Sequence, residues 1–285
     1  MGPGADAGSE SGAVTFRPFL AVLQREVLKL FRQRGRLLAS MIRPLIWLLV
    51  IGTGVESLIG GEGGGSYRQF LVPGILGMTM LFGAMLAALS TVYDKESGVM
   101  RMLVIAPFPH YWIVIAKLLG ATLSAAIQAL LLLALLGILG YLGAVVSWPL
   151  LALGILGTAL ACGAIGMVIA AITRTLDNYA VIMNVVIFPS FFFSGALYPV
   201  SHLPSALAWI AAVNPFTYGV DLLKHAALPP GHVFAADFSP LMDLGVLVLF
   251  TILAVTMACF RFSQESAVQP LLQVPGKRRR KPQPG

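Results

Sequence analysis

The sequence predicts an all-α fold of the polytopic membrane class. It has six transmembrane helices, an N-terminal amphipathic helix in the membrane interface and a re-entrant hairpin on the outer side before the last helix. Hydrophobic residues make up 58% of the 285-residue chain and charged residues only 11%, against about 25% in soluble domains. The apolar residues also gather in runs of about 20 residues, long enough to cross a bilayer as helices. A soluble fold is therefore excluded.

Composition divides the chain into three parts. Residues 1–15 have neither a basic start nor an apolar core, so we expect a disordered tail there and a first transmembrane helix that acts as the insertion signal. Residues 16–260 hold the apolar runs and form the predicted transmembrane domain. Residues 261–285 form a basic cytoplasmic tail, whose KRRRK run at 277–281 sets the topology or binds anionic lipid.

The elements are predicted in chain order as follows. In residues 16–36, apolar residues recur at helical spacing and basic residues fill much of the rest, which predicts the interfacial helix. A nucleic-acid site would leave the apolar stripe exposed, so no nucleic-acid partner is expected. The spans are predicted at residues 37–55, 70–92, 113–141, 148–172, 179–197 and 241–260. Residues 198–240, rich in Pro and His, form the predicted outer hairpin, with Asn214 and Pro215 capping and turning it.

Several spans carry features beyond their hydrophobicity. In the fourth span, small residues four apart allow close approach of another helix. Pro189 removes a backbone hydrogen bond, which predicts a break or kink in the fifth span. A lone Gln in the middle of the third span either forms a hydrogen bond to a neighbouring helix or contacts a substrate. The aromatic run of the fifth span either gates a path near the outer leaflet or packs against lipid and helices. These substrate-path candidates are Gln128, Phe188, Phe191, Phe192 and Phe193.

The stretch YDKESGVMRMLVIAPFPHYW, residues 93–112, separates the second and third spans. Its charges cannot cross the hydrocarbon, because one charged side chain near the bilayer centre costs about 2.5–3.5 kcal/mol. Gly and Pro residues divide it into a turn, a short amphipathic piece and a re-entry. It is therefore predicted to be a loop at the membrane surface, either a functional one or a solvated charged connection.

The Lys and Arg residues are distributed unevenly. All except Arg68 and Lys224 fall in segments that the predicted spans bring to one side, which includes both termini and the polar loop. The positive-inside rule places that side in the cytoplasm. Arg43 and Lys117, one turn inside their spans, are expected to snorkel back to the surface.

No constellation indicates an enzyme, a metal site or a bound cofactor. The histidines are scattered, without metal-ligand spacing or acidic partners in a shared helix register, and are interpreted as surface residues: His110, His202, His225 and His232. The sequence lacks a G-x-x-x-x-G-K-[ST] loop, and its spans lack the buried acidic pattern of proton or sodium coupling. Any energy source must therefore lie on another polypeptide.

Three segments resemble the permease subunits of type-2 ABC exporters, a family that includes drug and antibiotic efflux permeases, nodulation-factor exporters and polysaccharide exporters. In the loop after the second span, Glu96 is followed by Gly98 and by an apolar run that ends at Pro107. The second segment is FFFSGALYPVSHLP at residues 191–204, and the third is NPFTYGVDLLKHAAL at residues 214–228. The resemblance covers nearly the whole chain.

The resemblance implies a transport subunit in the bacterial inner (plasma) membrane. Two permease chains, as a homodimer, would pair around a path, and two copies of a separate ABC ATPase would dock beneath them. The residues that would couple the loop to the ATPase are Asp94, Glu96, Gly98, Arg101 and Pro107. The expected substrate is an amphipathic, drug- or antibiotic-like small molecule or a lipid-like compound. The alternatives are export of a glycolipid or polysaccharide, a lipid-modifying membrane enzyme and a passive scaffold.

Overall fold

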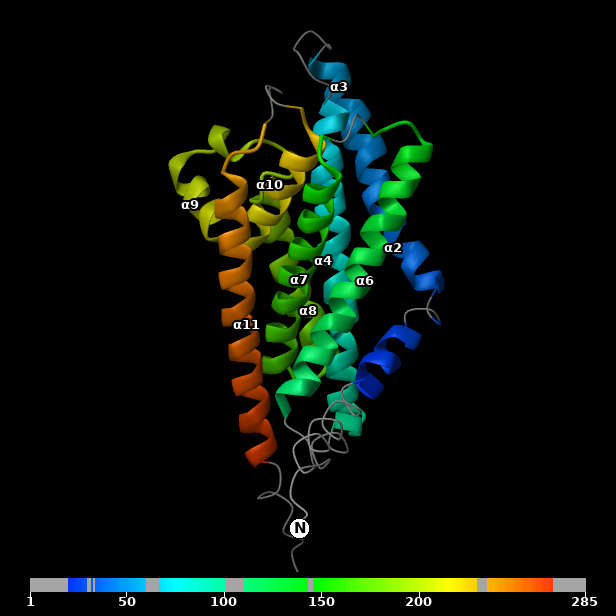
Figure 1. Cartoon of the computed structure of the whole chain (residues 1–285), viewed down its shortest axis with the longest axis vertical. Coiled ribbons are helices and arrows are strands. Elements are labelled where there is room, and N and C mark those ends of the chain that lie inside the picture. Colours follow the sequence, from blue (N-terminus) through cyan, green and yellow to red (C-terminus); the bar gives the residue numbers. More distant parts are fainter. Residues whose placement is uncertain are drawn as a thin grey trace, which may run out of the picture.

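The computed structural model describes residues 20–29, 32, 34–59, 67–100, 110–142, 146–229 and 235–268. In this part of the chain all regular structure is helical and no strand occurs (Figure 1). A first helical segment covers residues 20–29. The elements after it are α2 (Arg34–Trp47), the π-helix η1 (Leu48–Gly52), α3 (Thr53–Ile59), α4 (Tyr67–Glu96), α6 (His110–Ile138), α7 (Trp148–Ile172), α8 (Leu176–Phe192), the 3-10 helix η2 (Val200–His202), α9 (Ser205–Val213), α10 (Pro215–Ala227) and α11 (Pro240–Val268).

The long helices lie side by side along the vertical axis of Figure 1. In the described residues, α4, α7, the segment Tyr111–Ile138 of α6 and the segment Pro240–Gln264 of α11 are long and apolar enough to cross a membrane. Met41–Val55 and Leu176–Phe192 are shorter apolar helices, and α9 with α10 forms a pair bent by 88°. The helical segment at residues 20–29 and the end of α11 both lie at the lower end in Figure 1, whereas α3, α9 and α10 lie at the upper end.

The helix α4 lies inside the bundle, where it packs against α2, α6, α7, α8 and α10. Its 30 residues span about 45 Å, which exceeds the roughly 30 Å hydrocarbon thickness. The predicted second span ended at residue 92 and was too short. The helix continues through Asp94, Lys95 and Glu96, so these charges lie on its last turn and not in a loop.

Two other predicted boundaries are corrected. The helix α8 runs through Pro189 and ends at Phe192, so it does not break at the proline but ends five residues before the predicted end of the fifth span. The proline lies in the last turn, where its carbonyl accepts the Phe193 N–H at 3.0 Å and little of the helix remains to be disrupted. The helix α11 continues past Arg261, where the basic tail was predicted to begin.

The small residues of α7 produce close helix packing, as predicted. A Cβ atom at Gly163 would lie 3.1 Å from the side chain of Leu118 on α6. A Cβ atom at Gly166 would lie 2.8 Å from that of Ala88 on α4. Glycine at these two positions therefore brings α7 close to both neighbours at once.

The turn between α9 and α10 is also as predicted. The Asn214 side-chain oxygen accepts the Phe216 N–H at 3.2 Å, and Pro215 is the first residue of α10. The Asn214 amide also donates to the Ser190 carbonyl oxygen at 2.7 Å, which ties the turn to the end of α8. The cap thereby positions the bent pair against the rest of the bundle.

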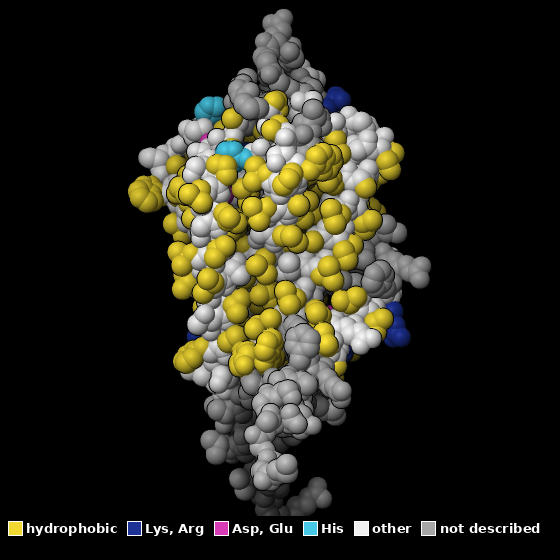
Figure 2. Space-filling model, viewed as in Figure 1, with side chains coloured by type: hydrophobic (Ala, Val, Ile, Leu, Met, Phe, Trp, Pro, Cys, Tyr) yellow, Lys and Arg dark blue, Asp and Glu magenta, His cyan; other side chains and the backbone are white. Residues whose placement is uncertain are grey.

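The outer surface is consistent with a lipid environment. In Figure 2, hydrophobic side chains cover the middle of the visible face, whereas the visible Lys and Arg side chains lie toward its two ends. Large apolar side chains are exposed along α11, including Leu249, Leu253 and Phe260. A surface of this kind would be a liability in water and is normal in lipid.

Candidate coupling site

The last turn of α4 carries three consecutive charged residues, Asp94, Lys95 and Glu96, at the lower end of the bundle in Figure 1. Successive helical residues point about 100° apart, so the three side chains leave α4 in different directions. Each of them reaches a different neighbouring element.

Asp94 lies in a buried ion cluster with a basic residue on each side. Its side chain is 0% exposed and contacts the Arg25 guanidinium and the Lys117 ammonium, each at 2.5 Å. Lys117, on α6, is itself only 1% exposed. The cluster therefore joins the helical segment at residues 20–29, α4 and α6 through charge-assisted hydrogen bonds, which are stronger than neutral ones.

Glu26 completes the cluster from the N-terminal helical segment. It accepts hydrogen bonds from Lys117 at 3.0 Å, from Lys29 at 3.1 Å and from Ser90 at 3.2 Å. Burial alone would raise the pKa of Glu26, but the two ammonium groups hold that pKa below its ordinary value. Glu26 is therefore ionised at neutral pH, and its charge balances Lys117 together with Asp94.

Lys95 and Glu96 bind the neighbouring helix ends. The Lys95 ammonium donates to the carbonyl oxygens of Ala171 at 3.2 Å and Thr173 at 3.5 Å, at the C-terminal end of α7. Glu96 accepts the backbone N–H of Leu176 at 3.0 Å, at the N-terminal end of α8. Both contacts match the helix dipole, since a cation meets carbonyl groups and an anion meets N–H groups.

The last turn of α4 thus connects the helical segment at residues 20–29, α6, α7 and α8. Gly98 follows with φ +78°, a left-handed conformation that favours glycine, and its N–H donates to the Lys95 carbonyl oxygen at 3.2 Å. Any force on the chain after Gly98 would act on a helix end that is attached to four neighbours. This arrangement suits mechanical transmission.

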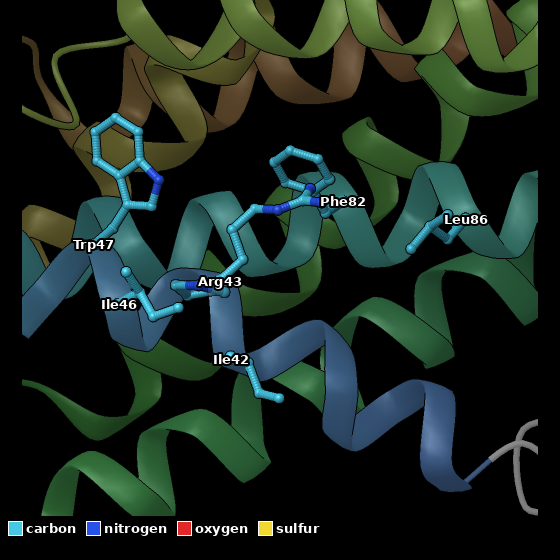
Figure 3. A pocket seen from close by; sticks show the side chains of 7 residues that line it. Ile42, Arg43, Ile46, Trp47, Phe82 and Leu86 are labelled. Carbon is cyan, nitrogen blue, oxygen red and sulfur yellow. The ribbon is translucent and has the colours of Figure 1, made fainter.

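A second feature is a pocket of about 360 Å³ between α2 and α4 (Figure 3). Its lining is apolar except for one cation and consists of Ile42, Arg43, Pro44, Ile46, Trp47, Phe82 and Leu86. The Arg43 side chain extends from α2 over the Phe82 ring, with Cζ 4.4 Å from the ring centroid. Trp47 meets Phe191 and Phe192 of α8 edge-on, at centroid distances of 5.9 and 6.0 Å. The pocket therefore lies beside the aromatic run of α8.

A family model described as "ABC-2 type transporter" matches residues 17–228, which extends from the N-terminal helical segment to the end of α10. The chain belongs to the ABC-2 type transporter family. Nodulation protein J of Rhizobium leguminosarum bv. viciae is 26% identical over 221 residues, which cover 76% of this chain and 82% of the relative. The inner membrane transport permease YadH of Escherichia coli K12 is 24% identical over 229 residues, which cover 80% of this chain and 87% of the relative. The family resemblance of the sequence motifs is confirmed, and the protein is an ABC-2 transporter permease subunit.

The structure brings part of the predicted coupling set of this permease together. Asp94, Glu96 and Gly98 are adjacent on the last turn of α4 and the turn that follows it. Arg101 and Pro107 lie outside the described residues. The side chain of Asp94 is buried among ion pairs, so it cannot contact an ATPase directly. It could only pass on a movement that other residues receive.

Sequence reasoning missed the partners of Asp94. The expectation that Lys117 snorkels to the surface is wrong, because its ammonium is buried and paired with Asp94 and Glu26. The sequence did contain a hint of this pair. Asp94 and Lys117 have opposite charges, and they lie on the two sides of one loop, near the ends of the two spans that the loop connects. The interpretation of all four histidines as lacking acidic partners is also wrong, because Asp221 and His225 are one turn apart on α10.

The predicted substrate-path residues of the ABC-2 permease occupy different environments. Gln128 is buried between α6 and α4, where its amide donates to Ser124 Oγ at 3.2 Å and lies against Gly83. Phe191 is 2% exposed and Phe188 is 49% exposed. Phe188 is thus available to a substrate or to lipid, whereas Phe191 packs within the bundle.

This difference gives a prediction for two alanine variants. Phe191→Ala removes a buried ring that contacts Trp47, and we expect it to lower stability by about 3–5 kcal/mol. Phe188→Ala removes an exposed ring, and we expect the melting temperature of the purified permease to stay within about 2 °C of wild type, since surface changes cost under ~0.5 kcal/mol. Thermal unfolding in detergent measures both. Equal destabilisation by the two variants would contradict the assignment of different environments.

Proposed function

We propose that this permease is the membrane subunit of an ATP-driven exporter that moves an amphipathic small molecule, drug- or antibiotic-like, or a lipid-like compound out of the cytoplasm. Two copies of the chain pair around the path as a homodimer. Two copies of a separate ABC ATPase dock at the lower end of the bundle in Figure 1. Glu96, Gly98, Arg101 and Pro107 receive the movement of the ATPase, and Asp94 transmits it.

The last turn of α4 is the observation that carries this proposal. Family membership indicates transport as the function. At this turn, a force applied by an ATPase at the lower end would reach four neighbouring helical segments. Packed helices switch between discrete arrangements and do not deform continuously, so a small displacement of this end can shift whole helices. The charge pairs keep the helices moving together.

The pocket between α2 and α4 supports the substrate class. Apolar walls with a single cation at one side suit a molecule that has a large apolar body and one polar or anionic group. Phe188, which is half-exposed, lies on the helix next to this pocket and forms part of the proposed path, whereas Phe191 and Phe192 pack behind the pocket against Trp47.

The charge distribution supports the orientation. The helical segment at residues 20–29, the last turn of α4 and the end of α11 lie at the lower end of the bundle, and they carry Arg25, Lys29, Lys95 and Arg261. In agreement with the positive-inside rule, the proposed orientation has the lower end and both termini in the cytoplasm of a bacterial cell, with the protein in the inner membrane.

The test is ATP turnover by the complex with the ATPase encoded nearest to this chain, purified and reconstituted in lipid. The double variant Glu96→Ala, Arg101→Ala is expected to lower permease-dependent turnover roughly 5- to 150-fold, the effect of losing about 1–3 kcal/mol of coupling. Glu96→Gln, which keeps an acceptor for the Leu176 N–H but removes the charge, separates the capping of α8 from ATPase docking.

The matched control is Asp177→Ala, an exposed acidic residue in the first turn of α8 at the same end. Its turnover should equal that of wild type. Unchanged turnover in the double variant would reject the coupling role of the loop, and failure to co-purify with any ATPase would reject the exporter. Stimulation of turnover by glycolipids and not by amphipathic small molecules would assign the alternative substrate class.

A further inference from the structure

A second charged cluster lies at the upper end of the bundle, far from the coupling site, where α10 meets the start of α11. Its centre is Asp243, in the first turn of α11, whose side chain is 0% exposed. Neither carboxylate oxygen of Asp243 has a hydrogen-bond partner in the described residues. A buried carboxylate without a partner is costly, and such groups are rare unless an ion or a proton satisfies them.

The one ammonium in the cluster is already used by other carboxylates. Lys224 lies 3.3 Å from Asp237 and 3.7 Å from Asp221. Burial alone would raise the pKa of Asp237, but Lys224 and the N–H groups of Val200 and Ser201 hold that pKa below its ordinary value. Asp237 is therefore ionised and takes up the charge of Lys224. The described cluster then holds three carboxylates against one ammonium.

Asp221 is held rigidly in the same cluster. Its two carboxylate oxygens accept the backbone N–H groups of Asp237 and Phe238, each at 2.8 Å. Each oxygen retains a lone pair after this bond, since a carboxylate offers about four acceptor positions. The backbone of residues 237–238 thereby fixes the Asp221 carboxylate toward Asp243 and His225 without exhausting its capacity to bind.

His225 lies one turn after Asp221 on α10 and between the two carboxylates. Its Nε2 is 3.9 Å from Asp221 Oδ2 and 3.8 Å from Asp243 Oδ2. One ligand atom of each of the three residues lies within 4.8 Å of the others. Around a tetrahedral ion with bonds of about 2.1 Å, ligand atoms are about 3.4 Å apart, so these separations must shrink by roughly 0.4 to 1.4 Å when the ion binds.

The Phe238 carbonyl oxygen adds a fourth candidate ligand. It accepts a hydrogen bond from His225 Nε2–H at 2.8 Å, and an ion that binds Nε2 would take the place of this proton. Adjacent ligands at right angles on an ion with ~2.1 Å bonds are separated by about 3 Å, so the carbonyl group and the imidazole can share one ion. Imidazole binds Zn²⁺ and other first-row ions well, whereas Mg²⁺ and Ca²⁺ prefer sites made only of oxygen.

We propose that Asp221, His225 and Asp243, with the Phe238 carbonyl oxygen, form a binding site for one Zn²⁺ or Mn²⁺ ion that joins α10 to α11 at the upper end of the bundle. The ion supplies the positive charge that Asp243 lacks. It fixes the bent α9–α10 pair to α11 and so sets the geometry of this end of the permease. The site does not depend on the exporter mechanism or on the coupling residues.

The test uses the full-length permease in lipid nanodiscs, stripped with a chelator and then titrated with Zn²⁺ or Mn²⁺, with Mg²⁺ as a comparison. We expect one bound ion per chain by elemental analysis. The melting temperature should rise by roughly 5–10 °C at an ion concentration of about 100 times Kd. Asp243→Asn and His225→Ala are expected to weaken binding at least about tenfold and to remove the rise in melting temperature.

The matched control is His202→Ala, an exposed histidine at the same end of the molecule but outside the cluster, which should bind and respond as wild type does. A rise in melting temperature that persists in Asp243→Asn would show an adventitious ion only and would overturn the proposal. A wild-type chain that binds no ion would overturn it as well.

Discussion

Asp94→Asn is expected to lower the melting temperature of the purified permease by roughly 10 °C, because breaking a buried ion pair costs about 3–5 kcal/mol and each kcal/mol shifts the midpoint by about 2–4 °C at this size. The variant keeps the size of the side chain but removes a charge that is 0% exposed. Lys117, which is 1% exposed, would then have only Glu26 to balance it. The cost arises mainly because this buried ammonium loses the closer of its two carboxylate partners.

A double variant separates this explanation from simple loss of packing. Asp94→Leu combined with Lys117→Met removes both charges and fills the volume with apolar atoms, and replacing a buried pair in this way is often neutral. We therefore expect the double variant to be more stable than Asp94→Asn alone. Asp177→Asn, which neutralises an exposed carboxylate at the same end, should match wild type. A wild-type melting temperature for Asp94→Asn would show that the ion cluster does not stabilise the lower end.

The bounds of a helix can be predicted closely from its apolar run where capping or helix-terminating residues lie at the ends of that run. The predicted fourth span, residues 148–172, has the same bounds as α7. There Ser147 caps the helix by accepting the Leu150 N–H, Pro149 lies in the first turn and Thr173 is extended. The capping residues and the hydrophobicity pattern indicate the same first and last residues, so either one alone would have predicted the bounds of α7.

Prediction failed where a helix continues beyond its apolar run. The last turn of α4 and the end of α11 contain charged residues, and hydropathy assigns these to loops. Helical hydrogen bonding does not depend on lipid, so a helix continues as long as its polar side chains find partners. Lys95 and Glu96 find theirs on the ends of α7 and α8, which no local pattern of α4 reveals.

The composition of the coupling site could be predicted only in part for the same reason. Asp94, Glu96 and Gly98 stand out in the sequence because they interrupt an apolar chain. Arg25 and Glu26 lie more than 60 residues away along the chain, and their contact with Asp94 and Lys117 depends on how the N-terminal helical segment docks against α6. Val22 and Ala116 form the buried apolar contact of that docking, which is a tertiary property. A periodic pattern on one helix does not specify which neighbour covers it.

Gly74→Ala is the second substitution for which we expect a large effect. An alanine in a helix is normally more stable than a glycine by about 1 kcal/mol. At Gly74 the sign is reversed, because a Cβ atom would overlap the carbonyl oxygen of Ala196 and lie 2.9 Å from the carbonyl carbon. Ala196 belongs to the turn after α8, which is held to α4 by the hydrogen bond from Tyr67 Oη to the Leu197 carbonyl oxygen at 3.0 Å. Backbone atoms cannot rotate away as a side chain can.

We therefore expect Gly74→Ala to cost about 3 kcal/mol, at the upper end of overpacking effects, and to lower the melting temperature by roughly 6–12 °C. Gly245→Ala on α11 is the matched control, because a Cβ atom there meets nothing within 4 Å and the melting temperature should stay the same or rise slightly. The pair compares identical chemical changes in two membrane-length helices. If both variants melt at the same temperature, α4 does not pack as closely against the turn after α8 as the structure indicates. The proposed transmission from the lower end of α4 to the aromatic path beside α8 would then lose its physical connection.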